Sequence, residues 1–373
     1  MRIAIATTGR FHVLDLAREL SGLGEDVTLH SWLPNSRTSK FGLPAANHRS
    51  TFPYLFPLAL WGRLLPKFLP IQYQHLTHRC TNYVITKHLQ PCDVFICMSG
   101  IILEAAYYAK EEFNAQIWLH RGSQHVLAHK RILDDCGGES IDSSTIEREL
   151  RGYELADRIV VGSQHVWDSF VAEEPSFEDK LFLNPYGVDL NMFYPKQIPA
   201  RQNQGPIRLL SVGNWSKQKG ADLIEQYVRG NSNVTHTHVG AIQDCPFPTT
   251  ERFRHIPPVP QWDLNDYYNK ADVFILASRQ DGFGAVIGQA LAAGLPVVCT
   301  QNTGGPTLTQ LEGLADRLFI SAANNFESLR QTIDRAIAQS SKLAPISDAQ
   351  REQLSWRGFA LRYQSELSRP HSR

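Results

Sequence analysis

The chain contains one pattern twice: a short β-rich run, a turn with glycine, and then a helical run. In the first half, residues 2–6 resemble a strand and 11–23 a helix, with Gly9 in the turn between them. In the second half, 207–212 resemble a strand and 220–228 a helix. Because β-rich and helical runs keep alternating after each start, we expect parallel sheets with crossover helices. The sequence therefore predicts an α/β protein with two doubly wound Rossmann-like domains.

A polar segment rich in Pro and Gly, residues 195–206, separates the halves and is typical of a linker. We expect the first domain to cover 1–194 and the second 207–354, each long enough to bury a core. An amphipathic run follows over 355–373. Two doubly wound domains that face each other place strand ends and helix N-termini on both sides of one cleft, where such sheets bind ligands.

The composition indicates a soluble globular protein, with 42% hydrophobic and 20% charged residues. Thirty-seven basic side chains balance thirty-seven acidic ones, so we expect no nucleic acid partner. The apolar run 1–6 is too short for a signal peptide, and no run reaches the roughly 18 apolar residues of a spanning helix. These features predict a cytoplasmic protein.

Charge is distributed unevenly along the chain, because residues 27–92 contain no carboxylate and seven Lys or Arg. The centre of this stretch, 52–73, interleaves aromatic and basic side chains. They are Tyr54, Phe56, Trp61, Arg63, Lys67 and Phe68. Its prolines at 53, 57, 66 and 70 favour only short helical pieces. We expect peripheral association with an anionic membrane on its inner face. The alternative is that these side chains pack inside the first domain and the basic groups line the cleft of a soluble acceptor.

A second glycine turn is the strongest candidate for a binding site. An apolar run, 273–276, is followed by Asp281, the tripeptide Gly282-Phe283-Gly284 and a helical run over 285–295. Two glycines allow the backbone to approach a ligand, and the first amides of a helix attract phosphate or sugar oxygens. Gln289 lies eight residues after Asp281, on nearly the same face.

This block resembles the signature of the retaining glycosyltransferases of family four, in which a Glu, Gly-Phe-Gly and a second Glu bind a nucleotide sugar. The first Glu is Asp281 in this chain, and the second is Gln289. Asp keeps the charge on a side chain one methylene shorter, whereas Gln keeps an acceptor and adds a donor. The resemblance implies the GT-B architecture of two facing Rossmann-like domains.

Residues 211–220 are similar to a second family motif, with an Arg after the first Gly and a Lys five positions later, both on the donor diphosphate. Lys219 occupies the Lys position. Asn214, after Gly213, occupies the Arg position, so one expected charge is missing, and Lys217 or Arg279 would have to replace it. An ammonium near a leaving diphosphate stabilises the negative charge that grows there.

Weaker matches at 147–163, 184–189 and 304–306 extend the resemblance over most of the chain. In the resembled family, a terminal helix with a Ser-Trp start such as Ser355-Trp356 crosses back onto the first domain. The order of these pieces implies that the whole chain follows the family plan.

On the first domain, Gly9 and Arg10 are expected to meet the donor phosphates across the cleft. His120 follows a β-rich run at the place where the family carries a His beside the donor sugar, and the alternative is a buried His bonded within its own loop. His125 and His129 are four residues apart, but no acidic or thiol third ligand is near them in sequence, so we expect no metal site.

The resemblance implies a retaining, metal-independent and cofactor-free transfer of a hexose from a UDP- or GDP-sugar to a hydroxyl of a glycan or lipid-linked acceptor. Lys219, Asp281 and His120 would be catalytic. The donor-binding set would be Gly9, Arg10, Gly213, Asn214, Lys219, Asp281, Gly282, Phe283, Gly284 and Gln289. Two alternatives stay open: a nucleotide-sugar epimerase of the same fold, and a non-catalytic relative that binds a nucleotide sugar or glycan.

Overall fold

The computed structural model describes residues 1–64, 70–135, 140–196 and 205–369 and contains two parallel sheets. The first has the strand order β3-β2-β1-β4-β5-β6-β7. Its strands are β1 (Arg2–Ala6), β2 (Asp26–Ser31), β3 (His48–Ser50), β4 (Val94–Met98), β5 (Gln116–Arg121), β6 (Arg158–Val161) and β7 (Leu181–Leu183). The strand order reverses between β1 and β4, which makes this pair the switch point of the first sheet.

The second sheet has the order β10-β9-β8-β11-β12-β13. Its strands are β8 (Ile207–Val212), β9 (Val234–Val239), β10 (Phe253–Ile256), β11 (Val273–Leu276), β12 (Val297–Thr300) and β13 (Leu318–Ser321). Its switch point lies between β8 and β11, the strands that precede the two motifs identified in the sequence. The predicted α/β class with two doubly wound domains is confirmed.

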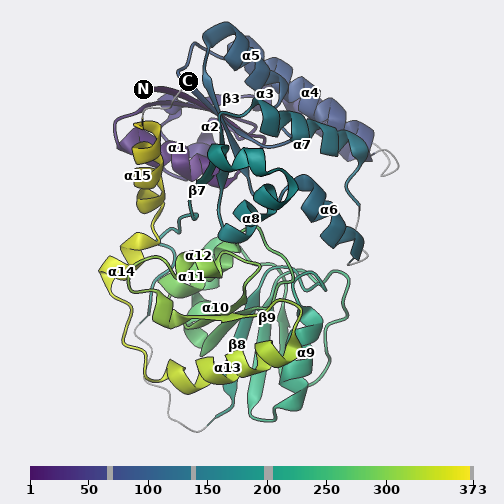
Figure 1. The fold of residues 1–373 in the computed structure, drawn as a ribbon, viewed down its shortest axis with the longest axis vertical. Coiled ribbons are helices and arrows are strands. Elements are labelled where there is room, and N and C mark those ends of the chain that lie inside the picture. Colours follow the sequence, from purple (N-terminus) through teal and green to yellow (C-terminus); the bar gives the residue numbers. More distant parts are fainter. Residues whose placement is uncertain (65–69, 136–139, 197–204, 370–373) are drawn as a thin grey trace.

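Helices cover both faces of each sheet, and the two domains follow one another along the long axis of the molecule (Figure 1). The helices that follow strands of the first sheet are α1 (His12–Gly22), α2 (Asn35–Ser39), α3 (Phe52–Leu64), α4 (Pro70–His88), α5 (Glu104–Phe113), α6 (Val126–Asp135), α7 (Ser143–Leu155) and α8 (Gln164–Glu173). Those after β8 are α9 (Ala221–Gly230), α10 (Leu264–Lys270), α11 (Ala285–Ala292), α12 (Gly305–Leu308), α13 (Phe326–Ser340), α14 (Asp348–Gln353) and α15 (Trp356–Leu367).

The central strands form because their sequences are apolar throughout. In β4, Phe95 and Cys97 join the core on one face of the sheet, whereas Val94, Ile96 and Met98 join the core on the other. β11 alternates in the same way between the two cores of the second sheet. A parallel strand covered by helices on both faces needs this continuous apolar sequence.

The last helix, α15, packs on the first domain although it follows the second in sequence. Its Phe359, Ala360 and Tyr363 are fully buried in one core with Ile5 and Leu14 of β1 and α1. In Figure 1 this yellow helix lies beside the purple α1. The structure therefore returns the chain to the first domain.

The expectation of short helical pieces around the prolines is wrong. α3 has 13 residues with Pro57 inside it, and α4 has 19 residues and begins at Pro70. Pro53 and Pro70 lie in first turns, where the missing N–H has no intrahelical partner, so only Pro57 removes a helical bond. Pro66, Lys67 and Phe68 lie outside the described residues. No helix in the described part is long and apolar enough to cross a membrane.

Candidate active site

The turns after β8 and β11 lie against each other at the carboxyl edge of the second sheet. Gly220 caps α9 in the left-handed region, and a Cβ there would meet the carbonyl oxygen of Ala277 at 2.1 Å. The Arg279 amide donates to the Gln218 carbonyl at 2.8 Å. Only glycine at 220 permits this approach. The two turns consequently form one continuous surface at the switch point.

The turn at 281–284 is shaped by close backbone contacts. Gly284 caps α11 with φ 74°, and a Cβ there would lie 2.8 Å from Leu276 Cδ2. A Cβ on Gly282 would lie 1.8 Å from the carbonyl oxygen of Gly122 in the first domain. The Gly304 amide donates to the Phe283 carbonyl at 2.7 Å. Both glycines are required, and the turn itself contacts the opposite domain.

Lys219 and Asp281 form an ion pair where the two turns meet. Lys219 Nζ lies 2.6 Å from Asp281 Oδ2, and the two side chains are 26% and 19% exposed. The other carboxylate oxygen, Oδ1, accepts from the Phe283 amide at 3.4 Å. The structure thus brings together two predicted site residues that are 62 positions apart, and it leaves both within reach of solvent.

Gln289 lies on α11 and is 8% exposed. Its Oε1 accepts a hydrogen bond from the Tyr268 hydroxyl at 2.9 Å. Tyr268 is fully buried, and burial raises its pKa well above the usual value, so it stays a donor. The carboxamide oxygen of Gln289 is held in this way, and its NH₂ group remains to donate to a ligand hydroxyl.

The missing arginine of the second motif is not replaced by Arg279. Its guanidinium makes two bonds of 2.8 Å to the Asp222 carboxylate and one of 2.9 Å to Asn324 Oδ1. Gly213 and Asn214 are exposed at the end of β8, and Lys217 is an exposed lysine in the same turn. Of the two predicted replacements, Arg279 is already neutralised, whereas Lys217 keeps an exposed side chain.

On the first domain, Gly9 and Arg10 form the turn between β1 and α1. Arg10 is exposed, and its Nη1 donates to Gln261 Oε1 of the second domain at 3.1 Å. Its guanidinium carbon also lies 3.8 Å from the centre of the Phe41 ring. Arg10 therefore bridges the two domains, and its contact with the donor phosphates stays a prediction.

His120 is fully buried, and both of its ring nitrogens have partners. Its Nδ1 lies 2.7 Å from His12 Nε2, and its Nε2 lies 3.1 Å from the Tyr363 hydroxyl of α15. Burial, with His12 nearby, lowers the pKa of His120 well below its usual value, and burial lowers the pKa of His12 to about 3. His120 is therefore buried, as the alternative expected, but its ring nitrogens contact His12 of α1 and Tyr363 of α15 and not its own loop. The predicted catalytic role of His120 has no support from its geometry.

Three hydrogen bonds join the domains around the 281–284 turn. Ser163 Oγ donates to the Gly282 carbonyl at 2.6 Å, and Gln280 Nε2 donates to Ser123 Oγ at 3.2 Å. The Gln164 amide, at the start of α8, donates to Thr307 Oγ1 at 2.8 Å. The carboxyl edges of the two sheets are thus in contact at the predicted donor turn.

Sequence reasoning missed Tyr268 and gave no role to Ser163. Ser163 did carry a signal, since a Ser directly after an apolar strand favours a helix N-cap, and it does cap α8. Its bond to Gly282 spans 119 positions and has no local signal. Tyr268 lies in an ordinary helical pattern, and only the packing of α10 beside α11 reveals its contact with Gln289.

His125 directly precedes α6, and His129 lies within it. In the described ranges, no group of three His, Cys, Asp or Glu side chains is placed to hold a metal ion. The Ser169 hydroxyl accepts from the His125 amide at 2.9 Å, and burial lowers the pKa of both imidazoles to about 4. Metal independence remains a prediction.

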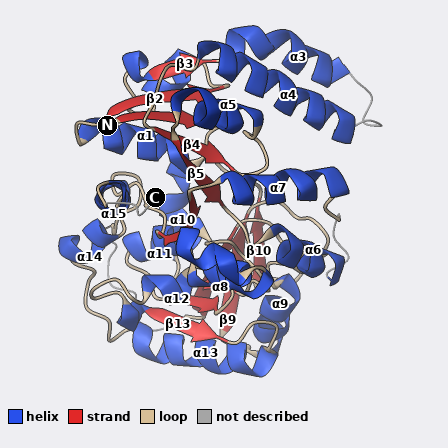
Figure 2. Ribbon diagram, turned by 45° about the horizontal axis from the view of Figure 1, so that its top comes forward, coloured by secondary structure: helices blue, strands red, loops and turns tan. Residues whose placement is uncertain are grey.

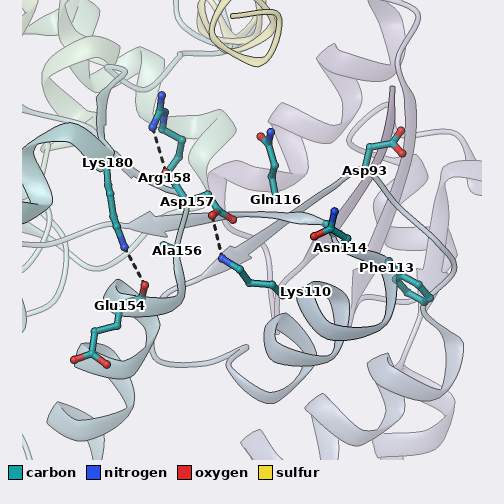
Figure 3. A pocket seen from close by; sticks show the side chains of 11 residues that line it. Asp93, Lys110, Phe113, Asn114, Gln116, Glu154, Ala156, Asp157, Arg158 and Lys180 are labelled. Carbon is teal, nitrogen blue, oxygen red and sulfur yellow. Dashed lines mark hydrogen bonds and ion pairs between the residues drawn. The ribbon is translucent and has the colours of Figure 1, made fainter. Parts of the chain in front are cut away.

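A pocket of about 710 Å³ lies at the opposite end of the first sheet, at the amino ends of β4, β5 and β6 (Figure 3). Lys110 Nζ donates to the carbonyl of Leu155 and to Asp157 Oδ1, both at 3.0 Å, and Lys180 Nζ donates to the Glu154 carbonyl at 2.9 Å. These lysines satisfy carbonyls at the C-terminus of α7. The polar lining is used structurally, so this pocket is not the candidate active site.

Comparison with known proteins finds a family match for the segment that contains both turns. Residues 196–339 match the family model described as Glycosyl transferases group 1. The D-inositol 3-phosphate glycosyltransferase of Paenarthrobacter aurescens is 27% identical over 205 residues, which cover 49% of this chain and 50% of that protein. The mannosylfructose-phosphate synthase of Agrobacterium fabrum is 24% identical over 337 residues, 79% of this chain and 71% of that protein. The chain matches about half the length of the first of these relatives.

Solved structures share the whole architecture at low identity. Anabaena HepE, solved in complex with UDP and glucose, has a TM-score of 0.68 at 14% identity and covers 99% of this chain and 100% of its own. The sucrose-phosphate synthase of Thermosynechococcus elongatus has a TM-score of 0.66 at 16% identity, with 98% of both chains covered. These structures confirm the predicted GT-B fold. The segment 196–339 is therefore similar to the group 1 glycosyl transferases, and the fold shared with these structures extends over the whole chain.

Proposed function

We propose that the chain is a retaining glycosyltransferase that moves a hexose from a UDP- or GDP-sugar to a hydroxyl of a glycan or lipid-linked acceptor. The observation that carries the proposal is the Lys219–Asp281 pair at the switch point of the second sheet. It joins the cation and the carboxylate of the two family motifs in one place. The match of residues 196–339 to the group 1 glycosyl transferases supports glycosyl transfer from a nucleotide sugar.

Lys219 would bind the donor diphosphate by leaving Asp281. A partly exposed ion pair contributes only about 0–1 kcal/mol, so a doubly charged diphosphate competes well for the ammonium. Asp281 is then free to accept a hydrogen bond from a hydroxyl of the sugar. When Lys219 moves from Asp281 to the diphosphate, it would neutralise the leaving group and release Asp281 to bind the sugar.

The remaining donor contacts follow from the same surface. The Gln289 NH₂ group would donate to the ribose, with Tyr268 holding the carboxamide in place. The Gly284 amide would face the donor, whereas the Gly213 amide already donates to the Val239 carbonyl at 3.0 Å, and Gly9 and Arg10 would approach from the first domain. Phe283 would pack beside the sugar, on a turn that Gly282 fits against the first domain.

The anomeric configuration of the sugar would be retained if the acceptor attacks the face that the diphosphate leaves. The bond from the anomeric carbon to the phosphate oxygen breaks, the bond to the acceptor oxygen forms, and the acceptor proton passes to the departing phosphate. No protein base is required, which agrees with a His12–His120 pair whose lowered pKa values keep both rings neutral. His120 would support the site through His12 and would not touch the sugar.

A second candidate is a non-catalytic relative that binds a nucleotide sugar or glycan. The pairing of Arg279 with Asp222 favours this candidate, because Arg279 then adds no free charge at the diphosphate. Lys217 and Lys219 are the cations of the two turns that remain for a diphosphate, which suits binding more than the stabilisation of a leaving group. An epimerase needs an acid and a base in the cleft, and the turn from Gly9 to Phe11 supplies no carboxylate.

We further propose that the enzyme works in the cytoplasm and associates peripherally with the inner face of an anionic membrane through residues 27–92. This location suits an acceptor that is carried on a lipid.

The test is a thermal-shift panel of nucleotide sugars followed by product analysis. A ligand at a hundred times its Kd adds about 2.7 kcal/mol of stability, so the true donor raises Tm. The donor that shifts Tm is then incubated with candidate acceptors, and the anomeric configuration of the product is read by NMR. A shift without turnover, with every acceptor class tried, supports the binding protein. An inverted product contradicts the retaining mechanism.

A further inference from the structure

The helical hairpin of α3 and α4 carries an unusual share of the exposed apolar side chains. Of the twelve large apolar side chains that are exposed in the described part of the chain, six lie on this hairpin. They are Phe52, Tyr54, Phe56, Leu60, Leu76 and Tyr83. Figure 2 shows α3 and α4 as the outer layer of the first domain. A cluster of this kind marks an interaction surface, whereas single exposed apolar side chains do not.

A groove of about 820 Å³ lies between the two helices. Its walls are mostly apolar, and Arg79 is the charged residue of its lining. The lining residues are Tyr54, Leu55, Pro57, Leu58, Leu76, Arg79, Cys80, Tyr83 and Val84. Tyr83 is 65% exposed and Tyr54 57%. The expected alternative, in which the aromatic side chains pack inside the domain, is wrong for Tyr54 and Phe56. The side chains of Trp61 and Arg63 lie outside the part of the structure that is described.

The opposite side of the hairpin is fixed to the domain. Asn82 Nδ2 donates to the Ile101 carbonyl at 2.9 Å, and its Oδ1 accepts from the Ala105 amide at 3.0 Å. Ile85 is fully buried in the core of the first sheet. The exposed side chains are therefore presented by an anchored element, and they are not exposed because the hairpin fails to pack.

The charge around the groove is positive and has no carboxylate of its own. Arg79 is exposed, and Lys87 Nζ lies 5.5 Å from the centre of the Tyr83 ring. Among carboxylates of the elements packed behind α4, Glu104 is bonded to Arg148 at 2.6 Å, and Asp142 accepts from the first amides of α7. Cations beside exposed aromatic rings fit a partner that is anionic at its surface and apolar below it.

The direction of the apolar stripe shows how such a partner would meet the hairpin. Phe52, Phe56 and Leu60 follow each other at intervals of four residues, which places them on one side of α3. The stripe formed by these three side chains therefore runs along the helix. A helix of this kind lies in the plane of a membrane interface with its apolar side down.

We propose that the α3–α4 hairpin lies on an anionic phospholipid bilayer, with the groove facing the acyl chains and Arg79 and Lys87 on the headgroup phosphates. The inference rests on the proposed function and narrows it, because it selects the lipid-linked class of acceptor. Both helices then lie parallel to the membrane, and the first domain is the membrane-facing domain.

The experiment uses the full chain and vesicles of phosphatidylcholine with or without phosphatidylglycerol. Co-sedimentation is expected with the anionic vesicles at low salt and is expected to weaken at high salt, because screening shortens the reach of Arg79 and Lys87. The Arg79→Gln variant is expected to bind about fivefold more weakly, the effect of removing one basic residue near the surface. The double variant Phe56→Ser/Tyr83→Ser is expected to lose roughly tenfold or more.

Two matched controls carry the same chemical changes elsewhere. Leu361 is an exposed apolar residue of α15, and Arg254 is an exposed arginine of β10. Leu361→Ser and Arg254→Gln are expected to leave vesicle binding unchanged. For every variant, the thermal shift with the donor nucleotide sugar reports whether the second domain is folded.

The outcomes separate this inference from the proposed function. Normal donor shifts without pelleting on anionic vesicles would overturn the membrane surface and leave the transferase intact. Pelleting that follows the hairpin variants, with no shift by any nucleotide sugar, would support the surface and overturn the donor assignment. Equal binding to neutral vesicles, or a dimer in light scattering that the double variant dissociates, would overturn the anionic bilayer as the occupant.

Discussion

The two sheets meet at their carboxyl edges, and these edges differ in charge although both are built from a strand, a glycine turn and a helix. The second domain places the Lys219–Asp281 pair there, within reach of solvent. The first domain places His12 against His120, with both imidazoles neutral. One backbone plan therefore supports two kinds of surface. The difference favours the second domain as the main site for the anion, whereas the first adds Arg10, the neutral histidine pair and the contacts that close the site.

The largest expected effect comes from removing the cation of the charged edge. Lys219→Ala is expected to reduce turnover by roughly a hundred- to a thousandfold, the usual effect of deleting one preorganised charge at a leaving group. Lys342→Ala is the matched control, because Lys342 is an exposed lysine after α13, and a change of about twofold is expected there. The measurement is kcat at saturating donor with the fold checked by circular dichroism. A near-normal rate for Lys219→Ala would show that the charge at the edge of the second sheet has no role in transfer.

The contact between the edges is tested at Gly282. A Cβ there would lie 1.8 Å from the Gly122 carbonyl oxygen, so Gly282→Ala must push the domains apart at this point. A displacement of about 1 Å costs roughly a hundredfold in rate. Gly22→Ala is the control, because its Cβ would meet nothing within 4 Å. If kcat/KM falls equally in both variants, closure at the 281–284 turn is not needed for activity.

The two departures from the family motif are expected to differ in effect. Asp281→Asn removes a charged acceptor and is expected to cost about 1.5 to 3 kcal/mol in kcat/KM. Gln289→Glu restores the residue of the family and still accepts from Tyr268, so a smaller change is expected. Steady-state kinetics with varied donor measure both. The reverse order of damage would show that the two roles are exchanged.

The buried histidines of both domains predict how the free energy of unfolding depends on pH. His120 is buried and its folded pKa lies well below the usual value, and burial lowers the pKa of His236 on β9 to about 3. Because the unfolded chain binds protons below about pH 6.5 and these folded rings do not, the free energy of unfolding must fall as the pH drops below that value. Each such group contributes a slope of at most about 1.4 kcal/mol per pH unit.

Urea unfolding between neutral and mildly acidic pH measures this slope. His120→Asn keeps a hydrogen-bonding side chain without a titrating ring, so a flatter dependence is expected. The control is His88→Asn, since His88 is exposed at the end of α4. An unchanged slope in His120→Asn would mean that the first edge carries charge in the folded state.

The smallest expected effect is that of a chelator. EDTA is expected to leave the transfer rate unchanged, since Lys219 would supply the positive charge that a metal supplies elsewhere. The rate before and after EDTA, with and without added Mg²⁺ or Mn²⁺, gives the answer. A loss that Mg²⁺ restores would contradict the metal-free mechanism.

Sequence reasoning predicted the fold well, because the central strands are apolar without interruption and glycines mark the turns. It located Lys219 and Asp281 by the spacing of their motifs, but it did not show that they bond to each other. Contacts such as Tyr363 with His120, 243 positions apart, depend on the arrangement of whole elements and leave no local pattern. The proline-rich hairpin was misjudged for a related reason, since the cost of a proline depends on its position in the helix.

The return of α15 to the first domain affects how the chain folds during its synthesis. The second domain draws its sheet from 207–321, and its two cores are complete once α13 and Leu354 have been made. The first domain lacks Phe359, Ala360 and Tyr363 until residues 359–363 have been made, although its strands emerge first. Its last step is therefore the closure of a very long loop, which is slow to find and leaves the apolar side of α1 uncovered in the meantime. The order of folding is expected to be the reverse of the order of synthesis.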